Sequence, residues 1–143
     1  MNPIWSSRSE AETQAVGERL GRRLRGGEVV LVCGDLGVGK TRFVQGVARA
    51  LDVRAPIVSP TFTLAVTYAG RLPVVHYDLY RVENARELVE MGFLEFDDPR
   101  TVCLVEWGDR AEPPSGAIRV DLELAADGSR RIAIHGLDLE ETA

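Results

Sequence analysis

Residues 34–41 read Gly-Asp-Leu-Gly-Val-Gly-Lys-Thr, which matches the phosphate-binding loop pattern Gly-x-x-x-x-Gly-Lys-[Ser/Thr]. Glycines let such a loop turn with its amide hydrogens pointing inward, where they form a concave site for an anion. The valine-rich run 28–33 before the loop predicts a buried strand, and apolar residues at helical spacing over 43–51 predict a helix after it. The amino end of that helix favours phosphate at the same place. The stretch therefore predicts a nucleoside triphosphate site in a strand–loop–helix unit.

The loop residues have distinct chemical roles toward a triphosphate. Lys40 can reach the outer phosphates, and the Thr41 hydroxyl can ligate the magnesium ion that accompanies them. We expect ATP and Mg²⁺ as cofactors. The remaining loop positions predicted to bind the nucleotide are Asp35, Leu36, Gly37, Val38 and Gly39.

Lysine usage supports this interpretation, because the chain has sixteen arginines and a single lysine, Lys40. A position that keeps lysine among so many arginines is one where a compact, mobile ammonium is needed and a planar guanidinium would not fit. Guanine-specific proteins with such loops usually read the base through an Asn/Thr-Lys-x-Asp segment, which requires a second lysine. The sequence therefore favours ATP over GTP.

Composition is that of a globular protein. The chain has 143 residues, 45% of them hydrophobic and 27% charged, which predicts one domain over residues 1–143. Its net charge of −5 disfavours a protein whose main role is to bind a phosphodiester backbone, so we expect contact with nucleic acid to be indirect at most. The longest apolar run, 29–33, is far shorter than the roughly 18 residues of a membrane span. With no secretory signal in the sequence, a cytoplasmic protein without membrane contact is expected.

Cysteine and histidine patterns do not predict a metal site. Cys33 and Cys103 each lie in an apolar run, so we expect buried thiols that behave as small hydrophobic groups. His76 and His135 are isolated, with no zinc spacing, and are interpreted as ordinary strand residues.

Other local patterns complete an α/β fold. Ser9-Glu10-Ala11-Glu12 is a capping box that opens a helix to Leu24, ended by Gly26-Gly27. A sheet of mixed strand directions with helices packed on it is the natural architecture, so we predict a three-layer fold like that of P-loop NTPases, with a C-terminal hairpin. The remaining predicted elements are a hairpin of 64–68 and 72–77, a helix over 84–91, a strand over 102–105, and a closing hairpin of 118–124 and 132–135.

Two predicted strands end in acidic residues that could serve the magnesium ion. Asp78 closes the segment 74–78, and Glu106 closes 102–106. Either carboxylate could hold the ion while the other orients an attacking water. The residues alone leave both assignments open.

Three further segments, in order after the loop, resemble the TsaE family. They are Ser-Pro-Thr-Phe-Thr-Leu at 59–64, His-Tyr-Asp-Leu-Tyr-Arg at 76–81 and Cys-Leu-Val-Glu-Trp at 103–107. The likeness extends from the N-terminal helix to the final hairpin. It implies a small ATPase required for threonylcarbamoyladenosine formation beside the anticodon of tRNA. It also implies docking on the TsaD–TsaB complex, with ATP hydrolysis needed for repeated rounds.

The resemblance also assigns roles within the site. It makes Thr41 and Glu106 the magnesium ligands, and Asp78 the acid that positions or activates water. Lys40 keeps its phosphate contact. The segment 59–64 resembles a switch loop that senses the terminal phosphate, in which Thr61 is the polar contact.

An adenosine pocket is implied at the start of the first helix. Ser9, Glu10 and Thr13 would contribute to it, and Arg130 of the last hairpin would also touch the nucleotide. Arg42 stands where many family members have a second threonine. Since the preceding threonine keeps the metal role, we expect this departure to matter little.

Two other functions remain compatible with a phosphate-binding loop. A kinase for a small metabolite would transfer phosphate to an acceptor, but 143 residues leave little room for an acceptor pocket and a lid. A nucleotide-gated binding module would hydrolyse ATP only incidentally.

Overall fold

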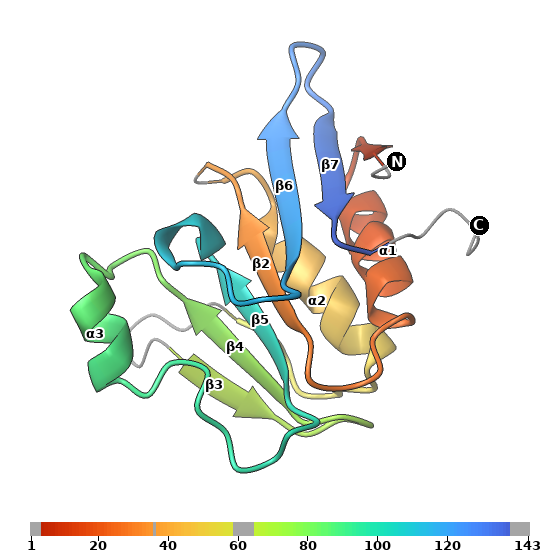
Figure 1. Cartoon of the computed structure of the whole chain (residues 1–143). Helices are drawn as coiled ribbons and strands as arrows, with labels where there is room; N and C mark the ends of the chain where they lie inside the picture. Colours follow the sequence, from red (N-terminus) through yellow and green to blue (C-terminus); the bar gives the residue numbers. More distant parts are fainter. Residues whose placement is uncertain (1–3, 36, 59–64, 138–143) are drawn as a thin grey trace.

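The computed structural model describes residues 4–35, 37–58 and 65–137. Its centre is a seven-stranded sheet of order β1-β7-β6-β2-β5-β4-β3 (Figure 1). The strand that leads into the loop, β2, is the middle strand of this order. The strands are β1 (Ile4–Ser7), β2 (Val29–Cys33), β3 (Ala65–Tyr68), β4 (Val74–Asp78), β5 (Val102–Glu106), β6 (Ile118–Leu124) and β7 (Arg130–His135).

Strand directions in the sheet are mixed, as predicted. β2 runs parallel to both β5 and β6, and β4 runs parallel to β5. The hairpins β3–β4 and β6–β7 are antiparallel, and β1 adds to the outer side of β7. Because β2, β5 and β4 are neighbours and parallel, their carboxyl ends meet at one edge of the sheet. The predicted α/β fold with a mixed sheet and a C-terminal hairpin is confirmed.

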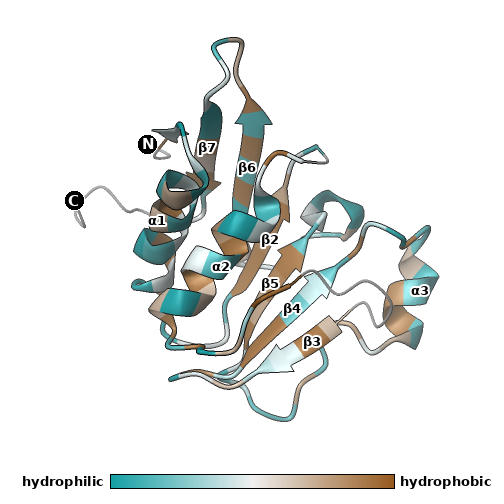
Figure 2. Ribbon diagram, turned by 180° about the vertical axis from the view of Figure 1, so that it is seen from behind, coloured by the Kyte–Doolittle hydropathy of each residue, from teal (hydrophilic) through white to brown (hydrophobic). Residues whose placement is uncertain are grey.

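Helices α1 (Glu10–Gly21) and α2 (Lys40–Ala50) cover one face of the sheet. Figure 2 shows this face from the front, with hydrophobic residues along the central strands β2 and β5 behind the helices. The apolar core on this face includes Val30 and Val32 of β2 and Phe43 of α2, all inaccessible to solvent. Their burial holds the loop between a fixed strand and a fixed helix.

The opposite face is covered by a thinner layer. It consists of α3 (Ala85–Glu90), the short 3-10 helix η1 (Gly108–Arg110) and the irregular segments around them. Side chains alternate between the two faces along β2, so Leu31 and Cys33 point to this second face. They belong to the same apolar cluster as Leu88 of α3. Within the described ranges, no helix combines the length and the hydropathy needed to cross a membrane.

Both cysteines are buried, as predicted. Cys33 and Cys103 are free thiols inside the sheet. Burial raises the pKa of the Cys33 thiol to about 11, and the pKa of Cys103 is raised further for the same reason. Neither group is therefore a reactive thiolate near neutral pH.

The predicted N-terminal caps of two helices are confirmed, whereas the predicted C-terminal end of the first helix is wrong. The Ser9 hydroxyl accepts from the amide of Glu12 and begins α1, and Asn84 begins α3 in the same way. However, α1 ends at Gly21 rather than at Leu24. Leu24 is still buried, because the turn after the helix carries it into the core, and this explains its place in the apolar pattern.

Strand β1 was not predicted from the sequence. Only its pairing with β7, from Ile4 opposite Ala133 to Ser7 opposite Arg130, defines it. A short edge strand of this kind depends on its partner rather than on an alternating pattern of its own.

Helices α1 and α2 approach closely through glycines. A Cβ atom at Gly46 of α2 would lie 2.0 Å from the carbonyl oxygen of Gln14 in α1, and one at Gly17 would lie 2.2 Å from the carbonyl oxygen of Phe43. Both contacts are with backbone, which cannot rotate out of the way. The close approach fixes the start of α1 beside the start of α2, where the candidate site lies.

We predict that Gly46→Ala lowers the free energy of unfolding by about 2 kcal/mol, since overpacking forces the two helices apart. Helix propensity alone would change stability by about 1 kcal/mol in the opposite direction. Denaturant unfolding of the wild type and the variant measures the difference.

Ala15→Gly, at an exposed position of α1, is the control for helix propensity without a packing effect. A Gly46→Ala protein at least as stable as the wild type would contradict this account of the helix contact.

Candidate functional site

The loop between β2 and α2 is closed by its own lysine. Lys40 is buried, and its Nζ donates hydrogen bonds of 2.7 Å to the carbonyl oxygens of Gly34 and Asp35. The ammonium also lies 4.1 Å from the ring centroid of Trp107. Burial lowers the pKa of Lys40, and the nearby carboxylates, first Glu106, partly oppose this effect. The compact ammonium of Lys40 fits between the two carbonyl oxygens, which agrees with lysine rather than arginine at this position.

The loop glycines take backbone angles that favour glycine. Gly37 and Gly39 have φ of 81° and 107°, and a Cβ at Gly37 would meet nothing within 4 Å. The backbone angle therefore requires glycine at Gly37, where space is not limiting. The Asp35 side chain is exposed and Val38 is buried. The predicted contact of Leu36 lies outside the described residues.

Thr41 and Glu106 meet at the edge where β2 and β5 end. The Thr41 hydroxyl donates a 2.9 Å hydrogen bond to Oε1 of Glu106. Glu106 is only 3% exposed, and its Oε2 lies 2.5 Å from Nε2 of His76. The two predicted magnesium ligands are thus in direct contact. The carboxylate of Glu106 is also held by His76 of the neighbouring strand β4.

Asp78 lies at the same edge, directly opposite Glu106 in the pairing of β4 with β5. Its Oδ1 accepts a 2.9 Å hydrogen bond from the amide of Tyr80. Burial raises the pKa of Asp78; the negative charge of Glu106 adds to this effect, while the Tyr80 hydrogen bond and the charge of Lys40 oppose it. Two carboxylates and one ammonium therefore share a partly desolvated edge.

A pocket of about 490 Å³ opens over these groups. Lys40, Thr41, Asp78 and Glu106 all contribute to it, so the structure brings together four of the predicted site residues. Trp107 forms part of its wall. Thr61, the predicted phosphate sensor, lies outside the described residues.

A second pocket of about 250 Å³ lies on the other side of Gly37 and Gly39. The structure gathers here the side chains assigned to the adenosine pocket. Arg130 reaches this pocket from β7, with its Nε donating to the carbonyl oxygen of Val38 at 3.2 Å. The residues from the start of α1 at this pocket are Ser9, Glu10 and Thr13.

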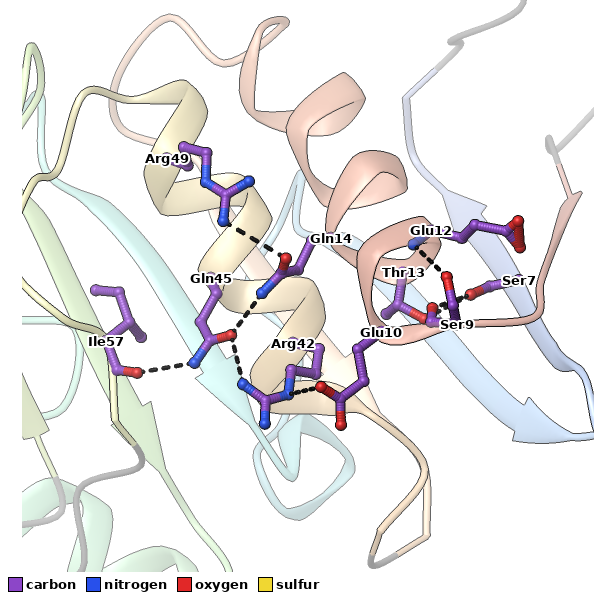
Figure 3. A network of polar contacts seen from close by, with 10 residues as sticks. All are labelled: Ser7, Ser9, Glu10, Glu12, Thr13, Gln14, Arg42, Gln45, Arg49 and Ile57. Atoms are coloured by element: carbon purple, nitrogen blue, oxygen red, sulfur yellow. Dashed lines mark hydrogen bonds and ion pairs between the residues drawn. The ribbon is translucent and has the colours of Figure 1, made fainter.

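Arg42 lines both pockets. Its Nε lies 3.3 Å from Oε2 of Glu10, and its Nη1 donates to Oε1 of Gln45 at 3.2 Å (Figure 3). Gln45 in turn donates to the carbonyl oxygen of Ile57 at 3.0 Å and accepts from Gln14 of α1 at 2.9 Å. A polar network therefore connects α1, α2 and the chain at Ile57 beside the first pocket.

Sequence reasoning missed two of the residues at the site. Gln45 gave no signal, because a polar residue on an exposed helix face is common. His76 was interpreted as an ordinary strand residue, although one signal was present: it precedes Asp78 by two residues in a strand, so both side chains lie on the same face.

Together, the fold and the loop define an α/β protein in which a loop of phosphate-binding sequence joins the middle strand to a helix, next to two strand-end carboxylates. The family model "Threonylcarbamoyl adenosine biosynthesis protein TsaE" matches residues 7–132. The chain belongs to the TsaE family.

Known relatives agree with this assignment. The chain is 40% identical over 130 residues to the tRNA threonylcarbamoyladenosine biosynthesis protein TsaE of Treponema pallidum, covering 90% of this chain and 96% of that protein. It is 41% identical over 139 residues to the TsaE protein of a Nostoc species, covering 94% and 85%. The crystal structure of YdiB from Bacillus subtilis superimposes with a TM-score of 0.74 at 30% identity, covering 94% of this chain and 84% of YdiB.

We predict that Asp78→Asn raises the melting temperature at pH 7. The folded state raises the pKa of Asp78, so it binds this proton more tightly than the unfolded state, and stability falls as pH rises between the unfolded and folded pKa values. Asparagine removes the buried charge and keeps an oxygen for the amide of Tyr80. Thermal unfolding at pH 7 and at pH 3 measures the effect, which should shrink at pH 3, where the carboxyl group is protonated in both states.

Asp98→Asn is the control of opposite sign, because hydrogen bonds from Arg100 lower the pKa of Asp98. If Asp78→Asn lowers the melting temperature at pH 7 as well, the charge of Asp78 stabilises the fold and the explanation is wrong.

Proposed function

We propose that this protein binds and hydrolyses Mg²⁺-ATP as an accessory factor in threonylcarbamoyladenosine modification of tRNA, acting with the TsaD–TsaB complex. Family membership and the names of the relatives support the place in tRNA modification. The observation that carries the ATPase part is the 2.9 Å contact between the Thr41 hydroxyl and the buried Glu106 carboxylate, at the mouth of a phosphate-binding loop. This site would work in the cytoplasm, where tRNA is modified.

The donor set fits a magnesium ion that arrives with its nucleotide. Mg²⁺ prefers oxygen ligands and is usually held by one or two protein groups together with substrate phosphates. The hydroxyl of Thr41 and the carboxylate of Glu106 are such groups. In the described part of the chain, no group of three or more His, Cys, Asp or Glu side chains could hold a metal ion by itself. When bound, the ion would neutralise charge on the phosphates.

Lys40 and Asp78 supply the other chemical groups. An ammonium has three hydrogens, and two of those on Lys40 bond to loop carbonyls, which points the group into the loop where the outer phosphates would lie. Asp78 faces the same pocket and would position or activate the attacking water. Burial raises the pKa of Asp78, which makes its carboxylate a stronger base than an exposed aspartate.

The second pocket is suited to the adenosine end of the nucleotide. It adjoins the loop through Gly37 and Gly39, so a nucleotide with its phosphates over Lys40 can reach it. Glu10 offers a carboxylate to hydroxyl or amino groups, and Arg130 offers a cation.

The overall charge favours a protein partner over direct tRNA binding. A net charge of −5 gives no electrostatic attraction to a phosphodiester backbone. We therefore propose that tRNA is reached only through the TsaD–TsaB complex.

Glu106→Ala is predicted to lower ATP hydrolysis by tenfold or more, because it removes a direct magnesium ligand. ADP and free phosphate are measured with and without TsaD–TsaB. The wild type should release both in equal amounts, and faster with the complex. Glu123→Ala, at an exposed carboxylate of β6, should behave as the wild type.

Two outcomes would contradict the proposal. ADP formed without an equal amount of free phosphate would indicate transfer to an acceptor, as in a kinase. A Glu106→Ala protein that has lost hydrolysis, yet supports repeated rounds of tRNA modification, would indicate a nucleotide-gated binding module.

A further inference from the structure

The carboxylate of Glu106 is held from two sides by different elements. Its Oε1 accepts from the Thr41 hydroxyl of α2 at 2.9 Å, and its Oε2 lies 2.5 Å from Nε2 of His76 in β4. His76 is completely buried, and Glu106 is nearly so. In this setting the histidine restricts which way the carboxylate can turn.

The other nitrogen of His76 shows why the residue is unusual. Nδ1 is buried and has no hydrogen-bond partner among the described residues. A hydrogen on Nδ1 would therefore be a buried, unsatisfied donor, which is costly. The tautomer with its hydrogen on Nε2 leaves Nδ1 as an unpaired acceptor instead, and it donates to the Glu106 carboxylate. The side chain of His76 therefore makes a single polar contact, from Nε2 to the carboxylate of Glu106.

The strand context gives no packing reason for a histidine. On the same face of β4, the residue two positions before His76 is the buried Val74, and its register partner in β5 is the buried Leu104. An apolar side chain would suit this position without leaving an unsatisfied nitrogen. The contact with Glu106 is the interaction that an apolar residue could not make.

We propose that His76 is a positioning residue that holds Glu106 with its Oε1 side turned toward Thr41 and the pocket. This inference rests on the proposed function, in which Thr41 and Glu106 bind the magnesium ion. Mutation of a residue that orients a metal ligand typically lowers metal affinity about 10- to 100-fold. Loss of the His76 contact therefore weakens the magnesium dependence of nucleotide binding and leaves metal-free nucleotide binding intact.

The experiment compares two amides at position 76 in the full-length chain. The Nε2 atom of glutamine can replace the histidine Nε2, whereas asparagine is too short to reach Glu106. Binding of a fluorescent ATP analogue is titrated with Mg²⁺, and is also measured in EDTA. We expect His76→Asn to raise about tenfold the Mg²⁺ concentration at which the Mg²⁺-dependent binding of the analogue is half-maximal. His76→Gln should stay close to the wild type, and all proteins should bind alike in EDTA.

His135→Gln is the matched control. His135 is the other histidine paired with a carboxylate, since its Nε2 lies 3.2 Å from Asp121, but it is on β7 and lines neither of the two pockets described above. This variant should not change the Mg²⁺ requirement. Should circular dichroism show that His76→Asn does not fold, His76→Leu replaces it, and His76→Gln must still keep the wild-type requirement.

The result that overturns the inference is a folded His76→Asn or His76→Leu protein with the wild-type Mg²⁺ requirement. A His76→Gln protein shifted as far as His76→Asn, or an equal loss of binding in EDTA, also overturns it, because each shows a structural role only. A wild type without Mg²⁺-dependent binding would be a different failure: it would refute the proposed function, and the role of His76 with it.

Discussion

Parallel pairing of β2, β5 and β4 is the constraint on which the rest of the site depends. Carboxyl ends of adjacent parallel strands lie at one edge of a sheet, and here the register sets Asp78 opposite Glu106. Glu106 is also paired with Val32, one residue before the end of β2. The loop that follows β2 therefore begins beside the strand that carries Glu106. Thr41 reaches Glu106 because α2 begins directly at Lys40.

This arrangement concentrates charged groups at a partly desolvated edge of the sheet, which opposes folding. Burial lowers the pKa of Lys40 and raises that of Asp78, so the folded chain disfavours the charged form of both. Apolar layers on both faces of the sheet hold the edge in place despite this cost. A cation beside the carboxylates would relieve their repulsion, which agrees with a site that binds a metal together with its nucleotide.

The elements nearest the loop could be predicted from the sequence because their patterns are local. Each local pattern predicts the element in which it lies: the valine run predicts β2, the apolar spacing predicts α2, and the cap at Ser9 predicts the start of α1. Strand β1 could not be predicted, since its pairing with β7 lies far away in the chain. The contact between His76 and Glu106 crosses 30 residues of sequence, so only the register of two strands reveals it. The contact of Arg42 with Glu10 could not be predicted for the same reason, because Glu10 is on another helix.

Titration calorimetry with Mg²⁺-ATP tests the central claim most directly, namely that the loop over the paired strand ends is a nucleotide site. We expect saturable heat from one site per chain, abolished in a Lys40→Ala protein that remains folded. No heat from the wild type at millimolar Mg²⁺-ATP, or undiminished binding by Lys40→Ala, would contradict it.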